Sequence, residues 1–421
     1  MDKFIIYGGK QLKGTVTVSG AKNASLALMP ATLLNNGLNR LYNTPELNDV
    51  FTMLKLLSQM GVKYSFNNHL LELDTKNISS FEAPYEHVKK MRASIYVLGP
   101  LLARYGFAKV SMPGGCAWGP RPVNLHLMAM EKLGAEITLD QGYIIAKANK
   151  LRGSYINFDI PSVGATGNTL MAAVLAKGNT IINNAACEPE ITNLCNFLIS
   201  MGAKIDGVGT SIIEIEGVDE LNPSEIETIP DRIEAGTLLI AGAITRGNIK
   251  VIGGVTNHLH SILSKLEDSG CNLFYNKEFI EINAENIEIK PIDVTTAVFP
   301  GFPTDMQAQW IAYMSLANGT SNVTDTIYTD RFNHVPELLR LGADIVVNEN
   351  TARVVGVKKL TGAKVMSTDL RASASLVLAG LAAEGTTEVL RVYHIDRGYQ
   401  KIEEKLKALG AEIERVQGSE Y

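Results

Sequence analysis

Six stretches of the chain are apolar on nearly every side, and a glycine follows each of them. The stretches are residues 24–34, 94–103, 169–176, 237–244, 310–317 and 373–382, followed by Gly37, Gly106, Gly178, Gly247, Gly319 and Gly385. A helix that is apolar all round is typical of a buried position. A glycine directly after a helix favours a left-handed C-cap, because it has no Cβ to strain that conformation. The pattern therefore predicts six buried helices, each capped by its glycine.

A second, amphipathic helix pattern follows each of these glycines. It ends at Gly61, Gly134, Gly202, Gly270, Gly342 and Gly410, 23 to 28 residues after the first glycine. In residues 399–409, for example, Ile402, Leu406 and Leu409 share one face. Short β-branched runs such as 180–182 and 248–252 lie between the two helices, and an alternating run such as 411–416 follows. Because each series repeats every 66 to 73 residues, the sequence predicts six copies of one helix–strand–helix–strand unit.

The repeat also predicts the domain organisation. A chain of 421 residues is too long for one ordinary core, and six units divide into three plus three. Breaks at residues 19–21 and 229–231 place residues 22–229 in one domain and residues 1–21 with 230–421 in the other. Two linkers crossing between the domains favour a hinge, with a cleft between the domains as the expected site.

Composition excludes several classes of protein. A net charge of −5 disfavours a general nucleic-acid binder, and no apolar window is long enough for a membrane span. Four distant cysteines without a CxxC pair, and an N-terminus unlike a signal peptide, favour a reduced cytosolic protein. His126, His334 and His394 are too scattered for a metal set, and no nucleotide phosphate loop is present, so we expect neither a metal nor a cofactor.

Charged residues recur at the predicted starts of the buried helices. Arg92, Gly164, Asp305 and Arg371 each lie 14 residues before the first glycine of their unit, and Lys22 and Arg232 lie 15 before theirs. Helix N-termini attract phosphate and carboxylate, so cations there act against the helix dipole. A single such cation is more often solvated or ion-paired, but several at matching positions favour a shared anion site.

The second unit contains a Gly/Pro-rich segment over residues 112–122 that accounts for its longer gap between glycines. Loops of this kind concentrate function. Cys116 lies in this loop near Arg121, which would favour a thiolate. Most cysteines are buried and unreactive, and this explanation fits Cys195 and Cys271 better than it fits Cys116.

Asp305 and Asp369 each have a plain structural explanation as well. Asp305 follows Thr304, a good N-cap, and suits the first turn of a helix. Asp369 precedes Arg371, which is a candidate ion-pair partner.

Seven motifs together resemble the UDP-N-acetylglucosamine 1-carboxyvinyltransferase family, the enolpyruvyl transferases that begin peptidoglycan synthesis. They are Ser-Gly-Ala-Lys-Asn-Ala at 19–24, Met-Arg-Ala-Ser at 91–94, the loop 113–122 with Cys116, Ser-Val-Gly-Ala-Thr at 162–166, Pro-Thr-Asp-Met-Gln-Ala-Gln at 303–309, Thr-Asp-Leu-Arg-Ala-Ser at 368–373 and Tyr-His-Ile-Asp-Arg-Gly at 393–398. The resemblance covers essentially the whole chain. It implies an α/β fold of two inside-out α/β barrels, each of three repeats, with the active site in the cleft between them.

The resemblance also implies the reaction and its residues. The enolpyruvyl group of phosphoenolpyruvate would move to the 3′-hydroxyl of UDP-N-acetylglucosamine through a tetrahedral intermediate, with release of phosphate. Cys116 would be the general acid and Asp305 the base, with Asp369 assisting. Lys22, Arg121 and Arg397 would hold phosphate and carboxylate, Asn23 would bond the reacting groups, and Arg92 and Arg371 would complete the cationic site. The uridine diphosphate would lie along Arg121, Pro122, Val123, Asn124 and Leu125, along Ser162, Val163 and Gly164, and near Ile327.

One position departs from the family pattern. Some members have a lysine two positions before the serine of Ser-Val-Gly-Ala-Thr, where this chain has Ile160 followed by Pro161. A nucleotide contact is therefore lost or supplied elsewhere.

Three alternative functions are less consistent with the sequence. The shikimate-pathway enolpyruvyl transferase shares the fold, but the Cys116 loop disfavours it. RNA 3′-phosphate cyclase would need a basic surface and a nucleotidylated histidine. A non-catalytic nucleotide-sugar sensor would have no use for an acid and a base together. The sequence leaves the oligomeric state open, a monomer included.

Overall fold

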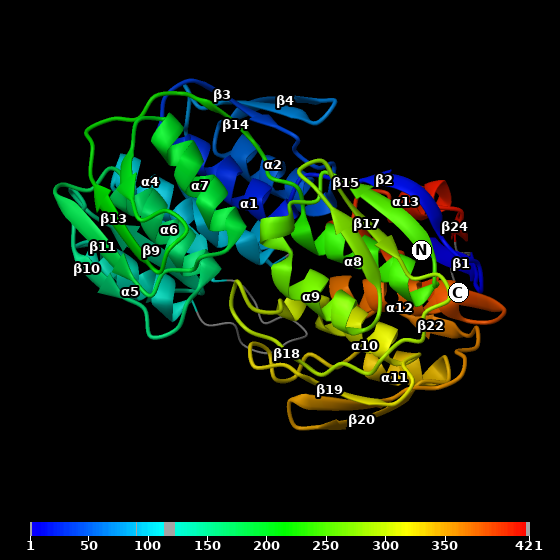
Figure 1. The fold of residues 1–421 in the computed structure, drawn as a ribbon. Helices are drawn as coiled ribbons and strands as arrows, with labels where there is room; N and C mark the ends of the chain where they lie inside the picture. Colours follow the sequence, from blue (N-terminus) through cyan, green and yellow to red (C-terminus); the bar gives the residue numbers. More distant parts are fainter. Residues whose placement is uncertain (1, 90, 113–122, 418–421) are drawn as a thin grey trace. The chain divides into compact units, whose positions relative to one another are not determined.

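The computed structural model describes residues 2–89, 91–112 and 123–417. The chain divides into two compact units (Figure 1). The first unit spans Gly20–Ile229, and the second unit joins Met1–Ser19 to Pro230–Tyr421.

The described residues of the first unit form three buried helices, four other helices and short strands. The buried helices are α1 (Lys22–Ala31), α4 (Leu98–Tyr105) and α6 (Val163–Ala173), with the 3-10 turns η1 (Thr32–Leu34) and η2 (Arg92–Val97) beside the first two. The other helices are α2 (Asn48–Gln59), α3 (Tyr85–Val88), α5 (Asn124–Lys132) and α7 (Pro189–Ser200). The strands are β3 (Leu38–Tyr42), β4 (Lys63–Asn67), β5 (Leu70–Asp74), β6 (Glu82–Ala83), β7 (Phe107–Ser111), β8 (Glu136–Asp140), β9 (Tyr143–Lys147), β10 (Tyr155–Asn157), β11 (Asn179–Asn183), β12 (Lys204–Asp206), β13 (Ile212–Glu216) and β14 (Glu225–Glu227).

The second unit repeats this plan. Its buried helices are α8 (Arg232–Ile244), α10 (Gln307–Met314) and α12 (Leu370–Ala382), and its second helices are α9 (His260–Asp268), α11 (Val335–Arg340) and α13 (Ile402–Ala408). The 3-10 turns are η3 (Thr256–His258), η4 (Thr304–Met306) and η5 (Val392–Arg397). The strands are β1 (Asp2–Tyr7), β2 (Lys13–Thr17), β15 (Asn248–Ile252), β16 (Asn272–Tyr275), β17 (Phe279–Asn283), β18 (Val294–Thr295), β19 (Thr320–Thr324), β20 (Asp344–Asn348), β21 (Thr351–Val355), β22 (Lys364–Met366), β23 (Thr386–Leu390) and β24 (Glu412–Gln417).

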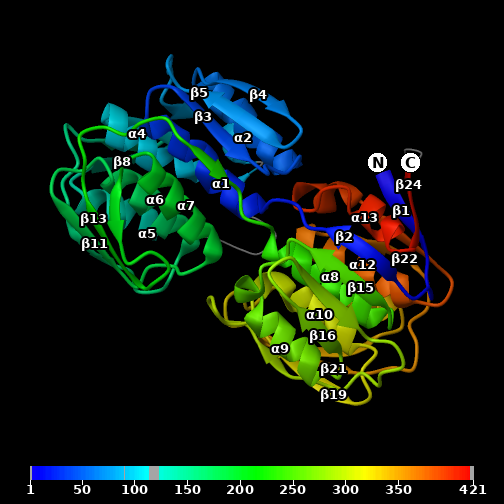
Figure 2. The ribbon, with the colours of Figure 1, turned by 45° about the horizontal axis from the view of Figure 1, so that its top comes forward.

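The described residues form six sheets, each with four strands and the same pattern of pairing. Their orders are β14-β3-β5-β4, β6-β7-β9-β8 and β10-β11-β13-β12 in the first unit, and β2-β15-β17-β16, β18-β19-β21-β20 and β22-β23-β1-β24 in the second. In each, the first pair is parallel and the next two pairs are antiparallel. The N-terminal strands β1 and β2 complete the last and the first sheet of the second unit (Figure 2).

Each unit has its own apolar core around its three buried helices. In α8, every residue from Ile233 to Ile244 is buried, as the all-round apolar pattern predicted. The sheets bury one face only: in β13, Ile213 and Ile215 are buried while Glu214 and Glu216 are exposed. This alternation covers the helices with the apolar face of each sheet and leaves the polar face to solvent.

The expected glycine C-cap is correct for Gly106, which caps α4 with φ 69°. It is wrong for Gly37 and Gly247, which do not take a positive φ. A Cβ on Gly37 would lie 2.4 Å from Pro223 Cγ, and one on Gly247 would lie 2.1 Å from the Leu12 carbonyl oxygen. These two positions need glycine because another segment passes too close for a side chain.

The other three first-series glycines lie beyond the ends of their helices. Gly178, Gly319 and Gly385 have φ values of 91°, 145° and 89°. They therefore take left-handed turns between a helix and the next strand rather than capping the helix itself.

The helix expected over residues 399–409 begins later than predicted. Lys401 has φ 45°, which breaks the helical path, and α13 starts at Ile402. Tyr399 therefore lies outside the helix, with only 1% of its surface exposed. As for membrane crossing, none of the described helices is both long and apolar enough to span a bilayer.

Candidate active site

Asp305 lies in η4 of the second unit, and its carboxylate binds two arginines. Arg371 Nη2 is 2.7 Å from Asp305 Oδ2, and Arg331 Nη2 is 2.8 Å from Oδ1. The arginine side chains are only 7% and 8% exposed, whereas that of Asp305 is 26% exposed. Each carboxylate oxygen thus accepts a charge-assisted hydrogen bond. The cluster therefore combines a partly open carboxylate with two buried guanidinium groups.

Arg371 is held in place by the start of α12. Asp369 caps this helix: its Oδ1 accepts hydrogen bonds from the backbone N–H groups of Arg371 at 2.8 Å and Ala372 at 3.1 Å. Asp369 is thus the N-cap of α12, and the guanidinium of Arg371 binds Asp305. Burial opposes the charge on Arg371, but Asp305 and Tyr399 together raise its pKa above the usual value.

Arg331 is fixed by a second set of contacts. Its Nη1 donates to Thr304 Oγ1 over 3.0 Å, and that hydroxyl donates to Asp325 Oδ2 over 2.7 Å. The N-cap role expected for Thr304 is wrong, because Pro303 occupies the N-cap position and the hydroxyl is directed to Asp325. Asp325 Oδ1 also accepts from the N–H of Ile327 at 2.9 Å, which places Ile327 on the turn next to this cluster.

Arg397 ends η5 in the same unit. His394, three residues earlier, is affected by both Arg397 and Asp369: burial is the main cause of its lowered pKa, the Asp369 charge opposes this shift and the Arg397 charge adds to it. The charges of Arg397 and Asp369 therefore both influence the pKa of His394.

In the first unit, Lys22 begins α1 and Asn23 follows it. Lys22 Nζ lies 3.6 Å from Asp49 Oδ2, and these side chains are only 13% and 6% exposed. No side chain caps the start of α1. Lys22 therefore carries its positive charge close to the N-terminus of the buried helix α1, as the repeat predicted.

Ser162, Val163 and Gly164 form the start of α6. The Ser162 side chain caps this helix by accepting from the N–H of Ala165 at 3.3 Å. A Cβ on Gly164 would lie 3.1 Å from both Cε1 and Nε2 of His126. The absence of a side chain at Gly164 therefore lets α6 pack against α5 and keeps the helix N-terminus uncrowded.

His126 is the buried residue that joins these two helices. Its Nδ1 lies 3.0 Å from Asn168 Nδ2 of α6. Burial, with the charge of Arg92 adding to it, lowers the pKa of His126 to about 3, so the ring is neutral at physiological pH. Val123, at the N-cap position, with Asn124 and Leu125, forms the beginning of the same α5 helix.

The comparisons with known proteins agree over the whole chain. The sequence profile of the EPSP synthase (3-phosphoshikimate 1-carboxyvinyltransferase) family matches residues 6–406. The UDP-N-acetylglucosamine 1-carboxyvinyltransferase of Chloroherpeton thalassium is 59% identical over 100% of this chain and 99% of its own. That of Chlorobium chlorochromatii is 57% identical over 100% of both chains. The chain belongs to the UDP-N-acetylglucosamine 1-carboxyvinyltransferase family. The resemblance inferred from the motifs is confirmed.

Two solved structures of enolpyruvyl transferases have the same fold as this chain. The enolpyruvyl transferase NikO from Streptomyces tendae superposes with a TM-score of 0.89 at 24% identity, covering 99% of both chains. EPSP synthase from Acinetobacter baumannii gives 0.77 at 18% identity, covering 99% of this chain and 100% of its own. The expected fold class is therefore confirmed.

The loop residues Cys116, Arg121 and Pro122 lie outside the described residues. Cys195 and Cys271 are buried, as expected for inert thiols, and burial raises the pKa of Cys271 and raises that of Cys195 to about 12. Burial also raises the pKa of the half-buried Cys187. Ile160, the position that departs from the family pattern, is 64% exposed. Among the described residues, no group of three His, Cys, Asp or Glu side chains could hold a metal ion.

Arg331 and Asp49 were missed by the sequence analysis, although a signal for them exists. Asp49, Glu190, Arg331 and Arg397 each lie 12 residues after the first glycine of their unit. Asp49, Glu190 and Arg331 are buried charged residues. A position in the first turn of the second helix, or in the segment just before that helix, is thus a second repeated position that carries charge, besides the start of the buried helix.

Proposed function

We propose that this chain transfers the enolpyruvyl group of phosphoenolpyruvate to the 3′-hydroxyl of UDP-N-acetylglucosamine and releases phosphate. Relatives of that name, 55–59% identical over the full chain, support this acceptor. The observation that carries the chemistry is the partly exposed Asp305 carboxylate held by two buried arginines. The reaction would be the first committed step of peptidoglycan synthesis, in the cytoplasm, and would use no cofactor.

Asp305 is the proposed base. It takes the proton of the acceptor hydroxyl as the sugar oxygen bonds to C2 of phosphoenolpyruvate, and Cys116 supplies a proton to C3. The Cys116 thiolate then takes a C3 proton back from the tetrahedral adduct, which restores the double bond and expels phosphate, and the proton on Asp305 leaves with the phosphate. Asp369, which caps α12 two residues from Arg371, assists at this centre by fixing the start of that helix.

The cations have a separate task. A carboxylate bound by two guanidinium groups is a weak base, because both oxygens are already hydrogen-bonded. The two guanidinium groups therefore hold the Asp305 carboxylate in one orientation, and they carry positive charge at the site where the anionic substrate would bind. Lys22, Arg92, Arg121 and Arg397 are the further cations we assign to phosphate and carboxylate, with Asn23 bonding the reacting groups.

The nucleotide is assigned to the start of α6, to residues 121–125 and to Ile327. The Ser162–Gly164 turn offers backbone N–H groups at a helix N-terminus, which suits a diphosphate. Its neighbour His126 is neutral, so it adds no charge to this position.

The experiment is to identify the product. Purified protein is incubated with phosphoenolpyruvate and either UDP-N-acetylglucosamine or shikimate 3-phosphate, and the acceptor is analysed by mass spectrometry and NMR. An enolpyruvyl ether at the sugar 3′-oxygen, formed with the nucleotide sugar alone, is expected. An ether on shikimate 3-phosphate would assign the other transferase activity, and no ether on either acceptor would favour a nucleotide-sugar sensor.

A further inference from the structure

The hydroxyl of Tyr399 binds one side chain from each of the three buried helices of the second unit. It lies 2.9 Å from Thr237 Oγ1 of α8, 3.1 Å from Gln309 Nε2 of α10 and 3.2 Å from Arg371 Nη1 of α12. Tyr399 itself is almost completely buried. Its hydroxyl is therefore a point where all three helices are joined by polar contacts inside an otherwise apolar core.

The directions of these hydrogen bonds follow from the donors available. The guanidinium of Arg371 and the amide NH₂ of Gln309 can only donate, so the Tyr399 oxygen accepts from both. Its single proton is then donated to Thr237, whose hydroxyl donates in turn to the Ile233 carbonyl over 2.7 Å. Burial raises the pKa of the Tyr399 phenol, so this proton stays in place at physiological pH.

Two of these contacts lead on to Asp305. Arg371 uses Nη1 for Tyr399 and Nη2 for the Asp305 carboxylate, so one planar guanidinium joins the two residues. Gln309 Nε2 also lies 3.0 Å from the Asp305 backbone carbonyl oxygen. The Tyr399 hydroxyl thus constrains both the side chain and the backbone of Asp305 without touching it.

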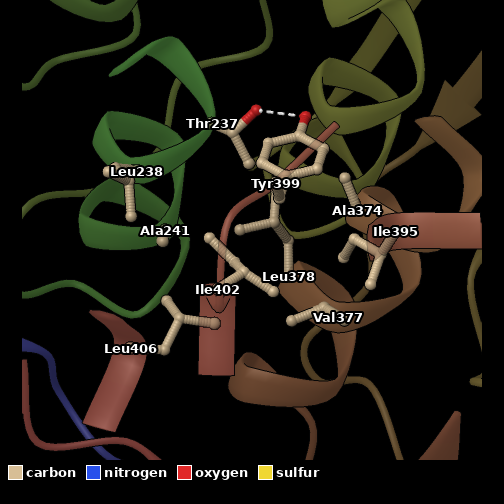
Figure 3. Close-up of a pocket in the computed structure, with 10 residues that line it drawn as sticks. All are labelled: Thr237, Leu238, Ala241, Ala374, Val377, Leu378, Ile395, Tyr399, Ile402 and Leu406. Carbon is tan, nitrogen blue, oxygen red and sulfur yellow. Dashed lines mark hydrogen bonds between the residues drawn. The ribbon is translucent and has the colours of Figure 1, made fainter. Parts of the chain in front are cut away.

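The rest of the Tyr399 ring faces apolar side chains. Figure 3 shows the hydroxyl directed at Thr237, with Leu378, Ile402 and Leu406 around the other end of the side chain. The cavity among these residues has a volume of ≈ 10 Å³, so it is too small for either substrate. An apolar space of that size does not favour an ordered water.

We propose that Tyr399 is a positioning residue for the proposed reaction: its hydroxyl fixes the Arg371 guanidinium, and thereby orients the Asp305 carboxylate toward the acceptor hydroxyl. This inference rests on the proposed function, because it requires Asp305 to be the base. Tyr399 is buried and takes no direct part in substrate binding. Its loss should therefore lower kcat and leave the KM for UDP-N-acetylglucosamine nearly unchanged.

The test compares Tyr399→Phe with Tyr313→Phe in the phosphate-release assay. Tyr313 is a matched control: it is a buried tyrosine of the same unit, hydrogen-bonded to Ser269 at 2.9 Å and away from this network. Since a hydrogen bond to a charged group is lost, kcat of Tyr399→Phe should fall about 10- to 100-fold, while Tyr313→Phe stays within about twofold of wild type. A kcat for Tyr399→Phe equal to that of Tyr313→Phe would overturn the inference.

A second pair of variants tests the inference even if Tyr399→Phe does not fold. Thr237→Val takes away the acceptor of the phenol proton and should lower kcat, whereas Thr237→Ser keeps a hydroxyl and should restore it. Equal kcat values for Thr237→Val and Thr237→Ser would contradict the network.

A double-variant cycle separates positioning from general stabilisation. In an Arg371→Lys background, the guanidinium that joins the Tyr399 hydroxyl to Asp305 is already missing. Adding Tyr399→Phe to that background should therefore change kcat by less than about threefold. If Tyr399→Phe costs the same factor in both backgrounds, the residue acts independently of Arg371 and the inference is wrong. If wild type forms no product with UDP-N-acetylglucosamine, the proposed function fails instead, and the positioning role fails with it.

Discussion

Arg371 and Asp305 meet with Nη2 2.7 Å from Oδ2, although 66 residues separate them in the chain. Both lie 14 residues before the first glycine of their unit, so the ion pair joins equivalent positions of successive repeats. The repeat places the starts of α10 and α12 side by side, and the residues that differ there supply a carboxylate and a guanidinium. Chemistry thus arises where copies of one structural unit have diverged.

Arg371→Ala should therefore damage both stability and activity. It leaves Asp305 without one of the two buried arginines that bind its carboxylate, and removing a buried charge partner costs about 3 kcal/mol of unfolding free energy. Loss of a preorganised cation should lower kcat/KM by about 100-fold or more. Denaturant unfolding and phosphate release measure the two effects.

Arg340→Ala, at a side chain that is 57% exposed, is the control and should change stability by less than about 0.5 kcal/mol. Equal behaviour of the two variants would refute the importance of the pair.

Gly164→Ala should weaken nucleotide binding. The added methyl group would lie 3.1 Å from the His126 ring and force the start of α6 to shift slightly. We expect the KM for UDP-N-acetylglucosamine to rise roughly tenfold, equivalent to about 1.4 kcal/mol. The KM for phosphoenolpyruvate serves as the internal control and should stay unchanged. Steady-state kinetics that show no preferential effect on the nucleotide would remove α6 from the proposed site.

His334 should make the protein less stable as the pH falls. Its ring is buried, and burial together with the Arg331 charge lowers its pKa to about 3, against about 6.5 in an unfolded chain. Between these values the unfolded state binds one more proton, so the free energy of unfolding decreases by up to about 1.4 kcal/mol per pH unit on acidification. Denaturant unfolding between pH 7 and pH 5 should show a smaller slope for His334→Gln than for wild type. The exposed His260→Gln is the control, and an unchanged slope in His334→Gln would disprove the assignment.

Cys116 should be the thiol that a reactive phosphoenolpyruvate mimic modifies. Fosfomycin, an epoxide, should form one covalent adduct in the presence of UDP-N-acetylglucosamine, because Cys195 and Cys271 are buried with raised thiol pKa values. Intact-mass analysis measures the adduct, and Cys116→Ser should abolish it. An adduct that persists in Cys116→Ser would place the reactive thiol elsewhere.

Much of this architecture could be predicted from the sequence because the repeat is encoded in local patterns. Glycine spacing and all-round apolar helices identify the six units, and the position 14 residues before each glycine identifies Arg371 and Asp305 as related. The role of a given glycine could not be predicted. Gly106 caps its helix, whereas Gly37 is required by the approach of Pro223, a residue distant in the sequence.

Tyr399 shows why the rest of the site could not be predicted. Its place before an amphipathic run suggested the first residue of a helix, and a buried aromatic residue ordinarily indicates core packing. Its hydroxyl gains a role only when three helices from three repeats converge on it, which is a property of tertiary packing. Arg331 was missed for a related reason, since its importance depends on Asp305 lying beside it.

The most direct test of this account is the rate of phosphate release from phosphoenolpyruvate with UDP-N-acetylglucosamine, for wild type and Asp305→Asn in parallel. Asn has nearly the same shape as Asp but cannot accept the hydroxyl proton, so wild type should release phosphate and Asp305→Asn should be slower by at least about 100-fold. Similar rates for the two proteins would show that Asp305 is not the base. Release by wild type with shikimate 3-phosphate instead of the nucleotide sugar would contradict the proposed acceptor.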